Sequence, residues 1–415
     1  MIDFFFYIIL IIEIYLFARI EYLKWGTLVT PFNMLALLFG VVTSLAIVYS
    51  YSNSGVKEFY FPSLIVWITG LAVFYLPACL IHVRPNRYKQ AISLKEKGDD
   101  LYILLYGITL LFLVISLYKI RSVGGGTTLG TDEFSEEYGA SGGAFAHISI
   151  FLSMMFAYFF CKFDKKHKLA LIPIILILLT TVAQASKTHI LSPILMGFFA
   201  RVITGRTHLS LKIVVIIALA SVGVFFGIYY ISLVLSGVTD SKDVYFEFVS
   251  HHFLVYFLGG PLSFSLDYQC GILEPDKTLC LIAPFVRVWE IISGESIKLT
   301  IANPIFLNMG ELGETNVRTF FGTLYAYSHS YSVLILLSLF VSILVYSVYY
   351  LSYVKKNIFL TIATSSNLTY LVLGSFFDFY WIHIYPYEIV IICLILYLIC
   401  SINNGIKYKK ASATA

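Results

Sequence analysis

The sequence predicts an all-α protein that crosses a membrane many times, and three observations predict it. Of its 415 residues, 59% are hydrophobic and only 13% are charged, against about 25% charged residues in ordinary soluble proteins. Aromatic residues make up 17%, which suits helices that meet the interfaces of a bilayer repeatedly. Long apolar runs recur along the chain. Together these features exclude a soluble enzyme, a secreted disulfide scaffold and a disordered chain.

Apolar runs able to cross a hydrocarbon core of about 30 Å define eleven candidate helices. These are residues 2–18, 33–51, 61–82, 101–118, 145–161, 169–185, 189–205, 211–235, 331–352, 358–377 and 386–403. The first run has no small-residue cleavage site after it, so we expect a retained helix rather than a signal peptide. We therefore expect one integral-membrane domain, residues 1–415, with about eleven transmembrane helices.

Basic residues predict the orientation, because cytoplasmic loops carry an excess of Lys and Arg. With the N-terminus outside and the C-terminus inside, 19 of the 28 basic residues fall in inside segments. Topology thus accounts for the formal net charge of +4, and nucleic acid is not an expected partner. Two outside segments are large, the glycine- and acid-rich loop 119–144 and the segment 236–330. Because the inside loops are short and basic, we expect the activity at the outer, periplasmic face.

The segment 236–330 contains no run apolar enough to span, although it is rich in aromatic residues. Residues 245–265 are amphipathic and are expected to form a helix lying in the membrane interface. The two cysteines of the segment, Cys270 and Cys280, either pack as free thiols or pair. An oxidising compartment permits pairing, and we predict a disulfide between them.

Several common catalytic motifs are missing from the sequence. It has no P-loop, no His-Glu-x-x-His and no Cys-x-x-Cys pair. It also lacks Asp-x-Asp, the usual way to hold a divalent ion on a nucleotide sugar. These absences argue against nucleotide-driven chemistry, and we expect neither a cofactor nor a metal.

Four basic residues on the outside stand beside Gly, Ser or Thr, or within apolar runs. They are Arg121, Lys187, Arg287 and Arg318. Cations with donor-rich neighbours at a membrane boundary suit a pyrophosphate group and would stabilise its departure. Each also has a structural interpretation. Basic side chains at helix ends often extend to the interface, Arg287 can pair with Glu290 at i,i+3, and Arg318 can pair with Glu314 at i,i+4.

A base that deprotonates a sugar hydroxyl would be an outside acid or a histidine. The candidates are His252 and Asp378, and Asp378 lies within an aromatic stretch, Phe376–Trp381. A carboxylate there is costly unless it is paired or functional, and aromatic surfaces suit sugar rings, so we add Tyr256 as a substrate-binding candidate. The structural alternatives are a packed histidine and an aromatic belt at the interface.

Taken together, these residues resemble the O-antigen or oligosaccharide repeat-unit polymerases of the Wzy type. The resemblance rests on the turn Ser186–His189, the stretch Tyr256–Pro261, the stretch Asn316–Phe321 and the plan of many spans with one large, late outside segment. Some members have paired Arg-x10-Gly motifs, whereas here Asp132, Lys298 and His329 stand at that offset after the three arginines. Roles are therefore not transferred by that motif.

The resemblance implies a glycosyltransferase with a GT-C-like fold in the bacterial inner membrane. Similar proteins join undecaprenyl-pyrophosphate-linked oligosaccharides, as donor and acceptor, into the O-antigen of lipopolysaccharide, without a nucleotide or a metal. A flippase and a chain-length regulator protein would be partners. Two alternatives stay open. One is an O-antigen ligase, and the other is a lipid-linked oligosaccharide flippase or transporter, which typically shows internal repeats and small loops on both faces.

Overall fold

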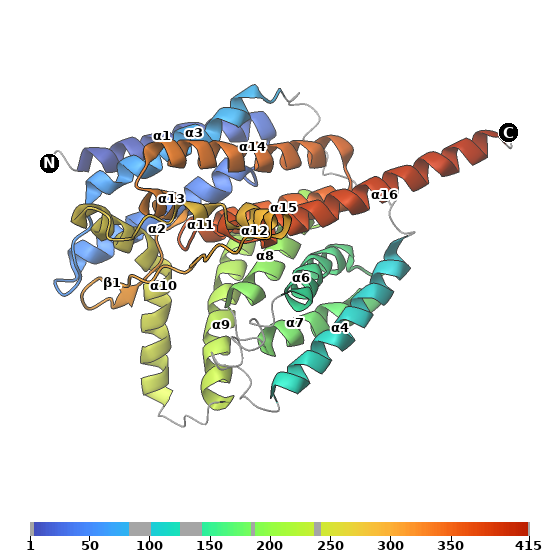
Figure 1. The fold of residues 1–415 in the computed structure, drawn as a ribbon, viewed down its shortest axis with the longest axis horizontal. Coiled ribbons are helices and arrows are strands. Elements are labelled where there is room, and N and C mark those ends of the chain that lie inside the picture. Colours follow the sequence, from blue (N-terminus) through green and yellow to red (C-terminus); the bar gives the residue numbers. More distant parts are fainter. Residues whose placement is uncertain (1–3, 83–100, 125–142, 184–186, 236–241, 414–415) are drawn as a thin grey trace. The chain divides into compact units, whose positions relative to one another are not determined.

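The structure is a computed structural model that describes residues 4–82, 101–124, 143–183, 187–235 and 242–413. It is built almost entirely of helices (Figure 1). The chain, expected as one domain, divides into two compact units. The first comprises residues 1–89, 250–350 and 370–387, and the second comprises residues 90–249, 351–369 and 388–415.

The first unit is a helical bundle. It contains α1 (Phe4–Trp25), α2 (Pro31–Ser52), η1 (Phe61–Ser63), α3 (Leu64–Leu80), α11 (Thr278–Leu281), α12 (Ala283–Ser293), α13 (Phe320–Ser328), η5 (Tyr380–Ile382) and most of α10 (Lys242–Cys270) and α14 (Tyr331–Lys355). Side-chain hydrogen bonds connect distant helices, since Ser342 of α14 donates to the carbonyl of Phe74 on α3, and Tyr346 donates to the buried carboxylate of Glu21 on α1. The bundle is thus closed by helices from both ends of the sequence.

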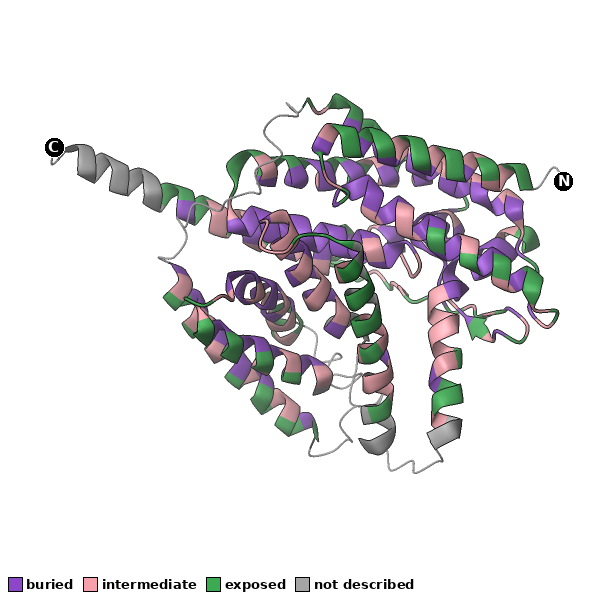
Figure 2. Cartoon of the chain, turned by 180° about the vertical axis from the view of Figure 1, so that it is seen from behind, coloured by how far each residue is buried: buried purple, intermediate pink, exposed green. Residues whose placement is uncertain are grey.

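The segment 236–330 contributes to the core of this unit. Every residue of α10 from 258 to 267 is buried (Figure 2), and α13 is buried except at Tyr325. The indole of Trp67 on α3 donates to the hydroxyl of Thr319 at 3.0 Å. Gly70 of α3 faces the ring of Phe321, which would lie 2.5 Å from an added Cβ. The missing side chain at Gly70 therefore lets α13 pack directly on α3.

A short hairpin joins this segment to the loop between α2 and α3. Its strands β1 (Leu307–Asn308) and β2 (Glu314–Thr315) are antiparallel, and the turn residue Gly310 forms a bridge with Val56. Gly310 has a φ of 80°, and an added Cβ would lie 2.1 Å from the carbonyl oxygen of Gly55. Both the conformation and the close approach require glycine at this position.

The second unit is also helical. It contains α4 (Tyr102–Gly124), α6 (Ala144–Lys162), η4 (Lys168–Ala170), α7 (Leu171–Ala183), α8 (Lys187–Ile203), α9 (Leu211–Leu235) and most of α15 (Ile358–Gly374) and α16 (Tyr385–Ala413). Arg201 of α8 donates to the carbonyls of Phe160 and Phe163 at 3.0 Å each, which satisfies carbonyls at the end of α6. A cation at that end also complements the helix dipole.

Each of the eleven predicted spans overlaps a helix of the structure. Six helices in the described part of the chain are long and apolar enough to cross a membrane. They are Pro31–Ser52, Phe61–Leu80, Tyr102–Gly124, Ala144–Lys162, Tyr331–Lys355 and Tyr385–Ile402. An all-α membrane protein is therefore confirmed, whereas the number of eleven spans stays a prediction. Of the predicted outside loop 119–144, residues 125–142 lie outside the described part of the chain.

Candidate functional site

Arg318 lies at the centre of a buried polar cluster in the first unit. Its side chain is 1% exposed, its Nε donates to Oδ2 of Asp267 at 2.9 Å, and its Nη2 lies 2.8 Å from Oε1 of Glu274. Further N–H groups donate to main-chain carbonyls, among them those of Val317 at 3.1 Å and Ile305 at 3.2 Å. The guanidinium is thus held by two carboxyl groups from the loop end of α10 and the chain that follows it.

The structural alternative for Arg318, a pair with Glu314, is wrong. Glu314 lies on β2, and its Oε1 accepts a hydrogen bond from the amide of Asn308 on β1 at 3.1 Å. A spacing of four residues brings side chains together only on a helix, and the chain between Glu314 and Arg318 is a strand followed by a loop. The predicted role of Arg318 in pyrophosphate binding stays a prediction.

The cluster is close to electrical neutrality. Burial is the main cause that raises the pKa of Glu274 to about 7, and the neighbouring Asp267 adds to it. The amide of Asn303 donates to the same carboxyl group. Because the Glu274 carboxyl group keeps its proton up to about neutral pH, it adds little negative charge beside Arg318.

Lys277 is a second cation of this region, and the sequence analysis did not single it out. It is 9% exposed, its Nζ donates to the carbonyl of Ala302 at 2.7 Å, and it lies 4.7 Å from the ring centroid of Tyr327. Burial lowers its pKa, and the negative charges of Glu274 and Asp378 counteract part of that effect. Its neighbours Pro275 and Asp276 are typical of an exposed turn, so no local sequence pattern indicates that Lys277 is buried.

Asp378, one of the two predicted bases, lies beside this cluster. It follows α15, and its Oδ1 accepts hydrogen bonds from the hydroxyl of Thr323 on α13 and, at 2.7 Å, from the amide of Phe379. Burial raises its pKa, while the positive charges of Arg318 and Lys277 work in the opposite direction. Chain segments at least forty residues apart, at 267–277, 318–327 and 378, therefore bring three acids and two cations together.

Close backbone packing fixes the loop that carries Asp378. The amide of Thr319 donates to the carbonyl of Phe377 at 2.9 Å. On α10, Gly260 faces the carbonyl oxygen of Phe376, which would lie 2.2 Å from an added Cβ. The ring of Tyr256, one turn earlier on α10, stacks on Phe377 with centroids 5.8 Å apart and an interplanar angle of 14°. Gly260 is thus required at the point where α10 meets this loop, because a side chain there would collide with the carbonyl of Phe376.

The structure brings some of the predicted site residues together and leaves others elsewhere. Asp378 lies near Arg318 in the first unit, and Tyr256 of the same unit stacks on Phe377, the residue before Asp378. The half-buried His252 lies one turn before Tyr256 on α10. Their functional roles stay predictions. Arg121, exposed in the last turn of α4, belongs to the second unit. So does Lys187, the first residue of α8, whose side chain lies outside the described part of the structure.

Arg287 lies on α12 in the first unit and is exposed. Its Nη1 lies 2.7 Å from Oε2 of Glu290, so the i,i+3 pair considered as its structural interpretation is confirmed. Its side chain remains 51% exposed, which leaves it accessible to a ligand. Its role in pyrophosphate binding stays a prediction.

The predicted disulfide between Cys270 and Cys280 is wrong, because both residues are free thiols. Cys280 is buried on α11, and its Sγ donates to the carbonyl of Thr300 at 3.6 Å. Cys270 is exposed at the end of α10. Each cysteine therefore has a separate environment, and the short α11 turns Cys280 inward to pack as a small apolar side chain.

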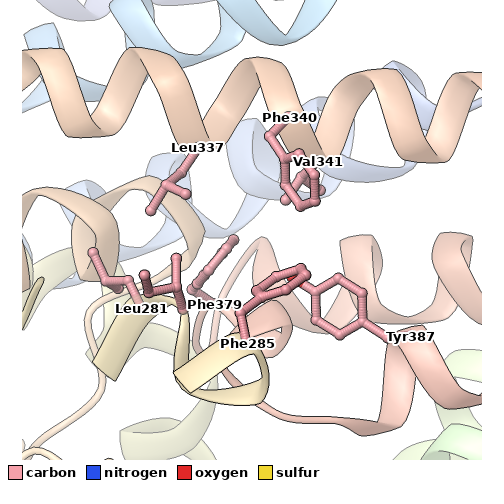
Figure 3. A pocket seen from close by; sticks show the side chains of 8 residues that line it. Leu281, Phe285, Leu337, Phe340, Val341, Phe379 and Tyr387 are labelled. Carbon is pink, nitrogen blue, oxygen red and sulfur yellow. The ribbon is translucent and has the colours of Figure 1, made fainter. Parts of the chain in front are cut away.

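An apolar pocket of about 260 Å³ lies within the same unit. Figure 3 shows Leu337, Phe340 and Val341 of α14 on one side, and Leu281, Phe285, Phe379 and Tyr387 on the other. Phe379 directly follows Asp378, and Leu281 belongs to α11, which begins after Lys277. The pocket therefore shares chain segments with the polar cluster.

Within the described residues, no three His, Cys, Asp or Glu side chains gather so as to hold a metal ion. The model of a family of unknown function, DUF6337, matches residues 55–405, and the chain therefore belongs to this family. No curated protein and no solved structure matches the chain.

Proposed function

We propose that this DUF6337 protein is a glycosyltransferase that polymerises undecaprenyl-pyrophosphate-linked oligosaccharide repeat units into O-antigen. The observation that carries the proposal is the arrangement around Asp378 in the first unit. A carboxyl group with a raised pKa, the cation Lys277 and the stacked rings of Tyr256 and Phe377 are contributed by chain segments far apart in sequence. Such a combination suits a sugar acceptor beside an anionic leaving group.

In the proposed reaction, the Asp378 carboxylate accepts the proton of an acceptor hydroxyl on the new lipid-linked repeat unit. The hydroxyl oxygen then forms a bond to the anomeric carbon of the donor glycan. The bond from that carbon to the pyrophosphate breaks, and its electron pair leaves with the pyrophosphate oxygen. A base works best when its pKa lies near the operating pH, and burial moves the pKa of Asp378 in that direction.

The leaving pyrophosphate gains negative charge in the transition state, and cations placed beforehand stabilise it. Lys277 is the cation of the first unit that combines a buried ammonium with the neighbourhood of Asp378. Arg287 is a second candidate because it is exposed. Arg318 serves mainly to position the loops in this scheme, since its N–H groups already have protein acceptors.

The proposal also includes a location. We place the chain in the bacterial inner membrane, with the N-terminus periplasmic and the C-terminus cytoplasmic. The distribution of 19 of the 28 basic residues supports this orientation. In it, both the segment 236–330 and the loop at Asp378 face the periplasm, where lipid-linked repeat units would be the donor and the acceptor.

A deletion strain distinguishes this function from its two rivals. Loss of a polymerase leaves a single repeat unit on the lipid A core, loss of a ligase leaves long lipid-linked polymer, and loss of a flippase leaves no surface unit. We expect the first pattern. Either of the other two would overturn the proposal.

Complementation of that strain tests the proposed site. We expect Asp378→Asn and Lys277→Met each to reduce polymer formation by about 100- to 1,000-fold, the size of effect measured for loss of one transition-state donor. Glu295→Gln and Lys298→Met are matched controls because both residues are exposed in the same segment. Membrane levels of each variant must equal wild type. Normal polymer from both site variants would contradict the assignment of Asp378 and Lys277.

A further inference from the structure

The apolar pocket opens beside surfaces that are suited to lipid. α14, which forms one wall, is among the helices long and apolar enough to cross a membrane. On this helix Leu336 and Ile343 are 65% and 51% exposed. Exposed aliphatic side chains on a membrane-spanning helix face hydrocarbon. The pocket therefore lies on the flank of a helix whose outer surface is apolar and suited to contact lipid.

The opposite wall begins with α12, and this helix also has an exposed apolar stripe. Phe285, Val288, Trp289 and Ile292 follow the spacing i, i+3, i+4, i+7, and they are 48%, 53%, 56% and 73% exposed. In a soluble protein such a stripe would be buried against a core. A short helix with a free apolar face, a tryptophan and a flanking arginine is typical of a helix lying in the membrane interface.

The lining of the pocket and the polar cluster share two chain segments. Phe379 lines the pocket, and the preceding residue is Asp378. Leu281 lines it as well, and it stands four residues after Lys277, which lies 4.7 Å from the ring of Tyr327. Two short chain segments thus carry both the side chains suited to an apolar chain and the buried ammonium suited to an anionic head.

We propose that the pocket between α12 and α14 holds the head-proximal part of the polyisoprenyl chain of the lipid-linked substrate. This inference rests on the proposed function, because it takes the pyrophosphate to lie at Lys277. In this arrangement the chain packs against Phe285 of α12 and Phe340 of α14, both of which line the pocket. The single pocket accommodates one hydrocarbon chain, which favours a polyisoprenyl lipid with one chain over a phospholipid with two acyl chains.

Two neighbouring leucines on α14 supply a matched pair of variants. Leu337 lines the pocket, whereas Leu336 is not part of the lining and is 65% exposed. We expect Leu337→Trp to fill the pocket and to weaken binding of undecaprenyl pyrophosphate to the purified protein by at least about tenfold. Leu336→Trp should leave the affinity unchanged, and inorganic pyrophosphate should bind both variants alike. Equal affinity of the two variants for undecaprenyl pyrophosphate would overturn the proposal.

A second measurement uses the unmodified protein and so does not depend on how a variant folds. A photoreactive polyprenyl pyrophosphate should label peptides from α12 and α14, and excess undecaprenyl pyrophosphate should prevent the labelling. Equal protection by phosphatidylglycerol would overturn the choice of occupant, and labelling elsewhere would overturn the site. A strain phenotype of the ligase or flippase kind refutes the proposed polymerase, whereas only these binding data refute the pocket.

Discussion

Two arginine–glutamate pairs in the segment 236–330 have nearly the same geometry and opposite electrostatics. Arg287 lies 2.7 Å from Glu290, and Arg318 lies 2.8 Å from Glu274. The hydrogen bond from Arg287 is the main cause that lowers the pKa of Glu290, whereas burial raises the pKa of Glu274 to about 7. The distance between arginine and glutamate therefore does not by itself determine whether the pKa of the glutamate is lowered or raised.

Desolvation explains the difference. Arg287 is 51% exposed, and water screens its interaction with Glu290. Arg318 and Glu274 are 1% and 0% exposed, and ionising Glu274 there would cost about as much in lost hydration as its attraction to Arg318 returns. The buried pair consequently serves mainly to hold three chain segments together. The exposed Arg287 remains accessible to a ligand.

The largest expected effect comes from removing the buried cation. Arg318→Ala should destabilise the protein by about 3–5 kcal/mol, because it leaves Asp267 and Glu274 buried without their cation. Thermal unfolding of the detergent-solubilised protein measures this effect. Arg287→Ala is the control, with an expected loss within about 1 kcal/mol. Equal stability losses for the two variants would contradict the contrast between the buried and the exposed pair.

The second prediction tests the backbone that holds Asp378 beside the buried pair. Gly260→Ala places a Cβ against the carbonyl of Phe376, at 2.2 Å in the present geometry. Because the obstacle is backbone, we expect a loss of about 1–3 kcal/mol and a displaced Asp378 loop, seen as reduced polymer formation. At Gly259 the nearest atom is a Thr315 methyl at 3.1 Å. Gly259→Ala should therefore be milder, and the reverse order would refute the close approach.

The same comparison shows where sequence information ends. Long apolar runs predicted helices at the right positions, because one run of the required length determines a helix locally. Arg318 and Arg287 have similar signatures in sequence, a cation beside an apolar run, yet their partners differ. The partners of Arg318 lie more than forty residues away, at Asp267 and Glu274, so only the tertiary fold brings them together.

Lys277 is a residue whose burial the sequence does not predict. Pro275 and Asp276 before it indicate an exposed turn, but packing against Tyr327 buries it. Neither composition nor periodicity records that contact. The sequence predicted only that Asp378 and α13 lie on the same side of the membrane. The positive-inside rule assigns loops to a side but does not place their side chains, so it could not predict the contact between Asp378 and Thr323.

The third prediction uses pH to separate the two pairs. Glu274 keeps a proton in the folded state that the unfolded chain releases above about pH 4.5. Stability from this group is therefore complete below about pH 4.5 and is lost as the pH rises through about 7. Glu290 has the opposite sign, since its lowered pKa contributes stability that is lost as the pH falls.

Thermal unfolding measured across this window should show the contribution of Glu274 directly. Glu274→Gln mimics the protonated carboxyl group, so it should reduce the decline in stability between about pH 4.5 and 7. Glu290→Gln should leave that decline in place. A wild-type curve that rises steadily over the same range, and a Glu274→Gln curve parallel to it, would show that Glu274 is ionised throughout.

The smallest expected effect on stability is the most informative about function. Arg287→Ala removes an exposed i,i+3 pair, which contributes at most about 1 kcal/mol, so the protein should fold and insert normally. If Arg287 binds the pyrophosphate, the same variant should still reduce polymer formation by about 100-fold or more. Arg287→Lys should retain only part of the polymer formation, because the planar guanidinium, which can donate two parallel hydrogen bonds, is replaced by a point charge. Glu290→Gln is the matched control, since it breaks the same pair and keeps the cation. Normal polymer from Arg287→Ala would remove Arg287 from the site and leave Lys277 as the cation of the first unit to be tested.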